Sequence, residues 1–588
     1  MFKYILKTLK YYKVQTLSLL IAFIAIQAGV CTGISSLHQT QVNVSEDIEK
    51  YSRDVYDILV RPNDSKISTV EIDKNKLIEP NYLSKGEGGI SIEDWKKIQS
   101  IQGVEVAAPV ASMGFFNNSI DSVKLSLPSD SGAVRASTDF KTTDGYRKYN
   151  IFPEDENSDS TVVFIPSSDN LDRPYIRSKS SDVSVVGNSK STTFLQWLLP
   201  PIYNFLVAVD MDSEEKLTGL EFDDVEHIFS EPLKEQPQEG GFYAYEIPVL
   251  INNEVKIPIE ADIKIEELEE IPDELKELAA EYENLPCASA GEALKKANLA
   301  EEIDEKIGDM KATNEKNISL DLSEYLKAFQ TTGIVFSPDG NIKTTNQGLM
   351  RFAPALEYYT TEGIKYRIEN SDGDVVLSPK PIGIKDEQIQ YNQLKKKGKA
   401  ITAGIKEYAE EGNMIFKLLP VGSLNFSGPE GNELVKSPLG IYGFEKFFIK
   451  KDENGNQLEK EREIYPTTTL GTYLLPKAHG FTTLEAAKLI KGDKPIDAIR
   501  VRVAGIERYD RRGKAKIERV AEEIVRKTGF HVDIVAGSSP RDVKINFSDY
   551  EGIQGLGQGV TSWLNLNVST MVQEKFNLLV LTEQHPVK

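Results

Sequence analysis

The side chains that most often carry out chemistry are few and scattered along this chain of 588 residues. The histidines include no His-x3-His spacing and no cysteine pair stands near them, so the sequence predicts no metal site. No Gly-x4-Gly-Lys-Ser/Thr segment is present, so any ATPase activity is assigned to a separate subunit. We therefore expect no catalytic residue, no cofactor and no enzyme activity in this chain by itself. The histidines are His38, His227, His479, His531 and His585.

Two segments near the C-terminus come closest to catalytic or nucleotide motifs. Ser538 and Ser539 lie in Ala-Gly-Ser-Ser-Pro, which lacks the Gly-x-Ser-x-Gly elbow of a hydrolase and favours a turn after a strand. A glycine-rich segment follows, but it does not lie between a clear strand and a helix, so it favours a flexible hinge over a nucleotide loop. The glycines assigned to this hinge are Gly552, Gly555, Gly557 and Gly559.

Three charged clusters could contact a partner, although each also suits a solvated surface. A basic cluster before the last predicted helix could contact lipid head groups, but acidic neighbours dilute its charge. Lys395 to Lys399 is typical of a solvated loop, and acidic helices predicted between Asp273 and Ile307 suit a solvated face or a cationic partner. The basic cluster is Arg508, Arg511, Arg512, Lys514 and Lys516.

The overall composition is that of a folded, acidic protein. Its 90 acidic and 69 basic residues give a formal net charge of −21, which argues against a nucleic-acid surface because phosphate binding needs a positive field. The two cysteines, Cys31 and Cys287, lie in very different surroundings, so no disulfide scaffold is expected.

The first structural element that the sequence predicts is an apolar run near the N-terminus. Val14 to Ile34 carries no charge, four lysines precede it, and no acidic residue occurs before Glu46. About twenty apolar residues span the roughly 30 Å hydrocarbon core of a bilayer as one helix. Lysines before the run place the N-terminus in the cytoplasm and the bulk of the chain outside. The anchor residues are Leu17, Leu19, Leu20, Ile21, Phe23, Ile24, Ile26 and Val30.

A cleaved signal peptide is the alternative for this run. A cleavage site needs small residues at its key positions, and the run ends in Gln-Ala-Gly-Val-Cys-Thr-Gly. Val30 before Cys31 also spoils a lipoprotein site, so the sequence favours a retained anchor over a cleaved signal.

Both ends of the remaining chain show the same order of elements. Near its start, a strand at Val55 to Val60 precedes a helix from Ile92 to Ile101, which Ser91 caps and Gly103 ends; a strand at Val104 to Val110 follows. Near its end, a strand at Ile499 to Ala504 precedes a helix around Ile517 to Ile524, which Gly529 ends, and a strand at Phe530 to Val535. One α+β domain built from both ends explains this repetition.

The middle of the chain is expected to be a large insert that is rich in β-strands. Phe205 to Val209 predicts a strand. Tyr245 to Ile251, an Asn252-Asn253 turn and the alternating residues up to Ile259 predict a β-hairpin.

Three segments resemble the periplasmic core domain of MacB/FtsX-type ABC transporter permeases. The first is Asp57 to Pro62, with Ile90 to Asp94 and Gly103 to Pro109. The second is Val503 to Ile506, with Ile517 to Ile524, Thr528-Gly529 and Val532 to Pro540. The third is Leu206 to Asp210 with Gly219-Leu220, which is similar to a segment of long Gram-positive members. The resemblance implies a two-part extracytoplasmic domain behind a first transmembrane helix. It also implies a separate ABC ATPase and three further membrane helices. These helices are not expected in this chain, because polar residues occur throughout Trp563 to Phe576 and only Leu578 to Leu581 is apolar.

The sequence thus predicts an α+β protein of the cell membrane with a single-pass anchor. The expected parts are residues 1–35 as cytoplasmic start and membrane helix, 36–115 and 491–550 as the two halves of a membrane-proximal domain, 116–490 as the insert, and 551–588 as hinge and truncated tail. The expected function is the extracytoplasmic domain of an export or mechanotransmission permease, with the lipid bilayer, an ABC ATPase and a multi-span permease subunit as partners and no nucleic acid. A stand-alone anchored binding or scaffold protein is the alternative. A secreted hydrolase is a third possibility, but no catalytic motif supports it.

Overall fold

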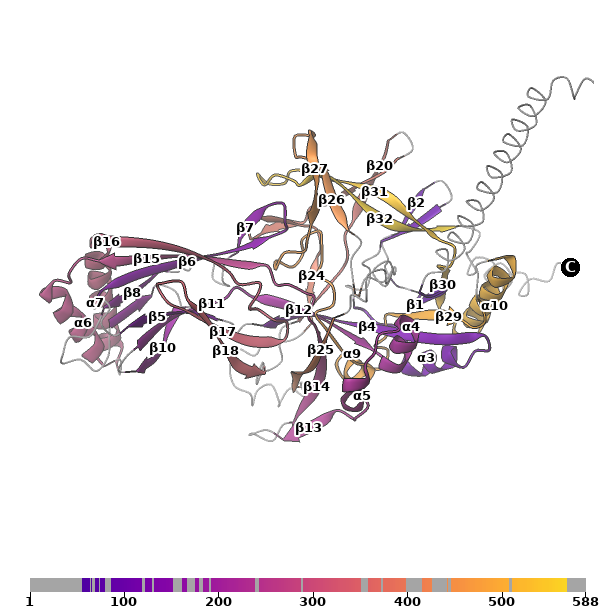
Figure 1. Ribbon diagram of the computed structural model, residues 1–588, viewed down its shortest axis with the longest axis horizontal. Helices are drawn as coiled ribbons and strands as arrows, with labels where there is room; N and C mark the ends of the chain where they lie inside the picture. The colour runs from indigo at the N-terminus through magenta and orange to yellow at the C-terminus, as the bar shows by residue number, and fades with distance from the viewer. Residues whose placement is uncertain are drawn as a thin grey trace, which may run out of the picture.

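The protein is described here from a computed structural model that defines residues 55–567 with several gaps. The gaps are residues 64, 66–68, 73–74, 80–85, 119–121, 129–131, 152–160, 166–174, 179–182, 190–191, 238–242, 287–288, 350–357, 372–373, 398–414, 426–440, 443–445 and 507–509. Within the described residues the fold is mixed α+β, with seven helices and mostly strands in several sheets, so the predicted α+β class is confirmed (Figure 1).

An eleven-stranded sheet occupies the centre of the molecule and joins the first described strand to strands from the last hundred residues of the chain. Strand β1 (Ile58–Arg61) pairs antiparallel with β29 (Ala498–Val503) on one side and with β30 (His531–Ile534) on the other. Strand β4 (Val104–Asn118) continues the sheet beside β29. The strands predicted at both ends of the chain are therefore confirmed, and they belong to one sheet. We call it the central sheet.

Helices cover both faces of the central sheet. Helices α3 (Ile92–Gln99), α9 (Leu484–Lys491) and α10 (Arg511–Thr528) share one apolar core with the sheet. Helices α4 (Met211–Thr218) and α5 (Asp223–Phe229) lie against the core of the other face.

The two helices predicted at the ends of the chain begin and end as their sequences require. In α3, the Ser91 hydroxyl accepts a hydrogen bond from Asp94 N at 3.1 Å, which caps the first turn. Gly529 follows α10 with φ 71°, a left-handed conformation that glycine adopts without strain. Gly103 has φ 98°, and a Cβ there would lie 3.0 Å from Val520 of α10, so this turn packs directly on the other helix. The predicted helix end at Gly529 is confirmed, whereas α3 ends earlier than predicted, at Gln99 with Ser100 as its C-cap, and Gly103 lies in the turn that follows.

The central sheet also takes strands from the middle of the chain. These are β12 (Ile202–Val209), β13 (Lys234–Pro237), β14 (Tyr243–Asn252), β19 (Tyr358–Thr361), β24 (Leu394–Lys396), β25 (Ile415–Leu424) and β28 (Gly480–Thr483). The strand predicted at Phe205 to Val209 is confirmed as part of β12. The proposed division at residues 116 and 490 remains a prediction.

Two further sheets form a β-sandwich at one end of the elongated molecule (Figure 1). One contains β5 (Ser122–Pro128), β10 (Val183–Ser189), β11 (Thr192–Leu198), β17 (Gln330–Phe336) and β18 (Ile342–Leu349). The other contains β6 (Val134–Thr143), β7 (Lys148–Ile151), β8 (Val162–Ile165), β9 (Tyr175–Ser178), β15 (Ile259–Leu268) and β16 (Ala312–Asp321). Helices α6 (Asp273–Asn284) and α7 (Ala290–Gly308), which confirm the predicted acidic helices, share a separate small core with the second sheet.

The predicted β-hairpin around Asn252 is wrong: its first strand is present as β14, but residues 255–258 form no strand and β15 begins only at Ile259. Strand β14 pairs with β13, β25 and β28 in the central sheet, whereas β15 pairs with β6 and β16 in the sandwich. The Asn252 side chain donates to Ala478 O at 3.1 Å and accepts from Glu254 N at 3.0 Å. The turn thus directs the chain from one sheet into the other, which alternation of apolar residues alone does not reveal.

A fourth sheet, of eight strands, stands above the central sheet in Figure 1. It contains β2 (Thr69–Ile72), β3 (Asn75–Ile78), β20 (Tyr366–Ser371), β21 (Asp374–Pro379), β26 (Phe447–Lys451), β27 (Gln457–Ile464), β31 (Ser539–Phe547) and β32 (Gly557–Asn567). The last described residue, Asn567, pairs with Asn75, so the last described strand lies beside an early one.

Two glycines expected in a flexible hinge lie in β32 instead. Gly559 pairs with Ile449 of β26 and Ile545 of β31, and Gly557 pairs with Phe547 of β31. A Cβ on Gly559 would lie 2.1 Å from the Phe447 ring, and one on Gly557 would lie 2.2 Å from Lys451 O. Gly555 would bring a Cβ to 2.3 Å from Phe547 O, while Gly552 occupies a tight turn with φ 87°. The glycines therefore allow close approach of neighbouring backbones and rings.

The predicted membrane anchor lies outside the described residues. Among the residues that the structure describes, no helix is long and apolar enough to cross a membrane.

Candidate functional site

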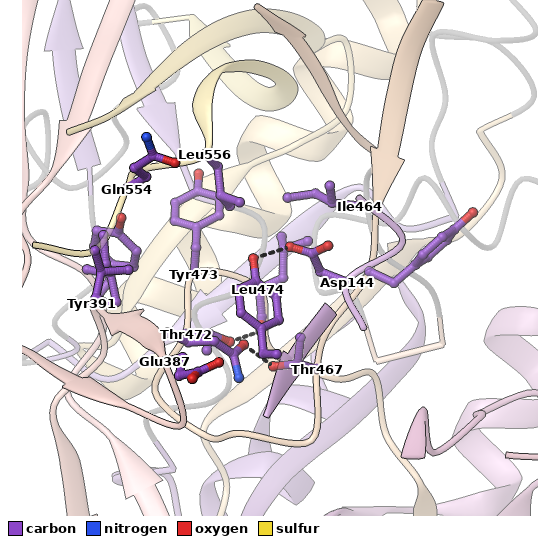
Figure 2. Close-up of a pocket in the computed structure, with 15 residues that line it drawn as sticks. Asp144, Glu387, Tyr391, Ile464, Thr467, Thr472, Tyr473, Leu474, Gln554 and Leu556 are labelled. Carbon is purple, nitrogen blue, oxygen red and sulfur yellow. Dashed lines mark hydrogen bonds between the residues drawn. The ribbon is translucent and has the colours of Figure 1, made fainter. Parts of the chain in front are cut away.

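A pocket lies where the fourth sheet, the β6–β7 hairpin and the small two-stranded sheet β22 (Gly383–Lys385) and β23 (Gln388–Gln390) meet (Figure 2). Its empty space is about 490 Å³, including the open mouth. Four tyrosines and two carboxylates dominate its wall, which we call the tyrosine pocket. They are Tyr149, Tyr391, Tyr465, Tyr473, Asp144 and Glu387; Gln388, Thr467, Thr472 and Gln554 add polar groups, and Ile389, Ile464, Leu474, Ile553 and Leu556 complete the lining.

Two buried rings form the inner wall. Tyr391 and Tyr473 meet edge to face with centroids 6.2 Å apart, and each also packs on Phe547. In Figure 2 their hydroxyls point toward Gln554 and Leu556. Burial raises the pKa of both phenols above its ordinary value, because a phenolate would lose its solvation. Both side chains are therefore neutral at physiological pH.

The backbone around Gly471 holds Tyr391 in place. The amide nitrogens of Tyr391 and Asn392 both donate to Gly471 O, at 2.8 and 2.9 Å. Gly471 has φ 92°, and a Cβ there would lie 2.2 Å from Gln390 Oε1. Glycine adopts this φ without strain, and a side chain here would also have to displace the Gln390 amide group.

Asp144 is held rigidly at the base of the β6–β7 turn. Its carboxylate accepts hydrogen bonds from Tyr146 N at 2.8 Å, Arg147 N at 2.6 Å and Tyr149 Oη at 2.7 Å. Burial, with the negative charge of Asp144 as a further cause, raises the pKa of the Tyr149 phenol. The aspartate thus supplies charge to the site while most of its hydrogen-bonding capacity is used within the turn.

Glu387 reaches the pocket from a strained turn. Asp386 and Glu387 are the central residues of the β22–β23 hairpin, with φ 51° and 58°. Such two-residue turns favour Asn-Gly, because side chains other than Gly, Asn and Asp rarely adopt positive φ. The Glu387 carboxylate accepts from Asn150 N at 3.3 Å and from Asn150 Nδ2 at 3.2 Å, so contacts to β7 hold the turn against the pocket.

Within the described residues, no lysine, arginine or histidine lines the pocket. The nearest basic group of the β6–β7 turn is Arg147, whose guanidinium is already engaged. It donates to Gln554 O at 2.9 Å and Gly555 O at 3.0 Å, and it pairs with Glu453 at 3.1 Å. Asp144 and Glu387 are therefore the charged side chains among the described residues that line the pocket.

The central sheet contains a second group of buried polar residues, and these are paired with one another. Arg61 donates through Nε to Asp533 at 2.7 Å, and Arg500 pairs with Glu214, which also accepts from the Tyr442 hydroxyl. Burial and the charge of Glu214 raise the pKa of the Tyr442 phenol. Another pair joins Lys491 to Asp497 at 2.6 Å. Because each charge has a partner, this group is structural in character.

The side chains weighed from the sequence do not assemble into a catalytic site. Ser538 lies in a turn, with its N donating to Val535 O at 2.9 Å, and Ser539 begins β31. His531 lies 3.2 Å from Asp533 and His479 is buried, accepting from Phe205 N at 3.0 Å. No group of His, Cys, Asp and Glu among the described residues could hold a metal ion.

The sequence did not reveal the tyrosine pocket. Its wall comes from four segments, around residues 144–149, 387–391, 464–474 and 553–556, so no local spacing brings them together. The one local signal is Asp386-Glu387 between short alternating strands, where a hairpin turn would ordinarily carry Asn-Gly.

Comparison with known proteins adds no relative. No protein-family model matches the chain, and neither a curated protein nor a solved structure is similar to it.

Proposed function

We propose that this chain is the extracytoplasmic domain of an ABC permease of the export or mechanotransmission type. The observation that supports this most is the position of β1 between β29 and β30. A domain inserted between membrane helices must receive and return the chain at neighbouring points. The central sheet holds the first described strand, β1, beside β29 and β30, and the fourth sheet holds the last described strand, β32, beside β3, so early and late segments of the described chain are neighbours. Most of the MacB/FtsX-like segments lie on strands of the central sheet.

The same arrangement suits the transmission of force. Arg61 on β1 and Asp533 on β30 form a buried ion pair, so the first and last strands of the central sheet are joined by side chains as well as by backbone hydrogen bonds. Movement of a membrane helix attached before β1 would pass into β29 and β30 together. In this proposal a separate ATPase drives the movement, and this chain has no enzyme activity by itself.

The proposed anchor is the apolar run Val14 to Ile34, with the N-terminus in the cytoplasm and the bulk of the chain outside. Its partners would be the bilayer, an ABC ATPase and a multi-span permease subunit. The first experiment is a pull-down of the N-terminally tagged chain from detergent-solubilised native membranes, followed by mass spectrometry. Recovery of an ABC ATPase together with a multi-span subunit is the expected result.

A matched pair of variants controls this experiment. Ile24→Arg places a charge in the middle of the proposed anchor and should remove the chain from the membrane fraction, because an unpaired arginine is costly in hydrocarbon. Leu294→Arg adds the same charge at an exposed position of α7, where the side chain is 64% exposed, and should leave membrane association unchanged. Recovery of the chain alone, at full yield from wild-type membranes, would contradict the permease proposal.

The tyrosine pocket favours a second candidate, a stand-alone anchored binding or scaffold protein. A pocket lined by neutral tyrosines and unneutralised carboxylates is suited to hold a ligand, and it lies outside the central sheet that the first proposal uses. The pull-down separates the two candidates, since an anchored binding protein would be recovered without an ATPase.

A further inference from the structure

The tyrosine pocket combines aromatic faces with negative charge. Tyr149, Tyr391 and Tyr473 present neutral rings, whose faces carry a negative electrostatic potential. Asp144 and Glu387 add carboxylates to the same wall, and Arg147 beside it is bound to Glu453 and two carbonyl oxygens. Both features attract a cation and repel an anion.

The available hydrogen bonds narrow the type of cation. A guanidinium ion binds best to a carboxylate with two free acceptor sites. Asp144 already accepts three hydrogen bonds from its own turn, and Glu387 is engaged with Asn150. The carboxylates therefore offer charge more readily than directed hydrogen bonds.

The aliphatic residues of the wall favour an organic cation over a metal ion. Ile389, Ile464, Leu474 and Leu556 line the pocket beside the tyrosines. A hydrated metal ion needs several oxygen ligands in place of its water. An alkylated ammonium group has methyl groups that bury against such a wall, needs no hydrogen-bond acceptor, and carries a charge that tyrosine faces stabilise.

We propose that the tyrosine pocket binds a quaternary ammonium head group. The trimethylammonium end lies against the tyrosine rings that line the pocket, and the rest of the ligand leaves through the open mouth, past Glu387. This inference does not rest on the permease proposal, because it uses only residues of the pocket. Such a head group could come from a free solute or from a lipid, and both sources share the chemistry that the wall recognises.

The test is a titration of the detergent-solubilised full chain by isothermal calorimetry. The probe is choline chloride, and its neutral isostere 3,3-dimethylbutan-1-ol is the matched control for shape without charge, with sodium chloride as the control for ionic strength. We expect choline to bind about tenfold more tightly than the neutral compound. Equal affinities, or no binding of choline at millimolar concentration, would overturn the proposal.

Variants assign the binding to this pocket. Tyr391→Leu removes a ring and should reduce choline affinity about tenfold or more, while Tyr391→Phe keeps the ring and should change it little. Glu387→Gln should weaken choline several-fold without affecting the neutral isostere. Glu324→Gln is the charge-matched control, because Glu324 is exposed in another part of the molecule and pairs with Lys256. Unchanged affinity in Tyr391→Leu, with an unchanged thermal transition, would place any binding elsewhere and contradict the proposal.

Glycerophosphocholine distinguishes the two sources. If the ligand is a free solute, its added phosphate weakens binding through repulsion by Asp144 and Glu387. If a lipid head group is the ligand, glycerophosphocholine binds at least as well as choline, because the phosphate then lies outside the mouth. Either result supports recognition of the ammonium group, whereas loss of discrimination against the neutral isostere excludes it.

Discussion

The central sheet and the tyrosine pocket differ in whether their carboxylates are paired with basic side chains. In the central sheet each buried cation has a buried anion beside it, as in Arg61 with Asp533 and Arg500 with Glu214. In the pocket, two carboxylates share a wall with tyrosines and no cation lines it within the described residues. A paired charge fixes the fold, whereas an unneutralised one leaves electrostatic potential for a ligand. The contrast separates a structural polar group from a candidate site without any relative to compare.

The largest effect is expected from a variant that removes Arg500 and so breaks a buried ion pair of the central sheet. Arg500→Met leaves Glu214, which is fully buried, without its cation, and we expect the unfolding free energy around the central sheet to fall by about 3–5 kcal/mol. Native-state hydrogen exchange of the β29 and β4 amides measures this loss locally, which matters because a chain with several sheets need not unfold in one step.

The matched control is Arg500→Met combined with Glu214→Gln, which removes both charges and keeps a hydrogen-bonding group for Tyr442. Most of the lost protection should return, since the cost of the single variant comes from an uncompensated buried carboxylate. If the double variant is as unstable as the single one, the ion pair is not the reason for the loss.

A smaller loss is expected in the fourth sheet, where Phe447 packs on Tyr473 of the tyrosine pocket. Gly559→Ala would bring a Cβ to 2.1 Å from the Phe447 ring, and the overpacking should destabilise the fourth sheet by about 1–3 kcal/mol. Thermal unfolding followed by tyrosine fluorescence checks this expectation. Gly308→Ala is the control, because nothing lies within 4 Å of the added methyl group. A neutral Gly559→Ala would support the flexible hinge over the packed strand.

The pH dependence of the central sheet gives a third test. Burial lowers the pKa of His479 to about 3, and its Nδ1 accepts a hydrogen bond from Phe205 N. Since the unfolded chain takes up a proton near pH 6.5 and the folded chain does not, this histidine costs stability as the pH falls from 6.5 toward 3. We expect a loss of about 2 kcal/mol between pH 7.5 and 5 from this group.

His479→Asn isolates that contribution, because an asparagine oxygen can accept the same backbone hydrogen bond without titrating. Between pH 7.5 and 5 the variant should lose less stability than the wild type. Hydrogen exchange of the β12 and β28 amides, compared at the two pH values, measures this difference. Parallel pH profiles would show that His479 is protonated in the folded protein.

The sequence predicted the two ends of the central sheet well because their signals are local. Ser91 before an apolar-periodic helix, Gly529 after another and alternating strands beside them each depend on a few neighbouring residues. The partners with which these strands pair could not be predicted from the sequence. Asn252 looks like a hairpin turn in sequence, but β14 and β15 join different sheets, since alternation specifies a strand and not its neighbour.

The tyrosine pocket was missed for a related reason. Tyr149, Tyr391 and Tyr473 are brought together only by tertiary packing, over a separation of more than three hundred residues. The glycines from Gly552 to Gly559 illustrate the same limit, because glycine allows both flexible connections and close packing, and only the neighbouring Phe447 and Lys451 distinguish the two.

The smallest change in stability is expected from a double substitution in the β22–β23 turn. This variant tests the pocket against the structural ion pairs, because it should raise stability and lower choline affinity. Asp386→Asn with Glu387→Gly gives the β22–β23 turn the residues that its positive φ angles favour, and should stabilise the hairpin by about 0.5–1 kcal/mol. The same change removes the Glu387 carboxylate and should weaken choline binding several-fold. Asp386→Asn alone is the control, since it eases one position of the turn and keeps Glu387. If the double variant gains stability and binds choline as the wild type does, Glu387 is not part of the site, and the strain in this turn has another cause.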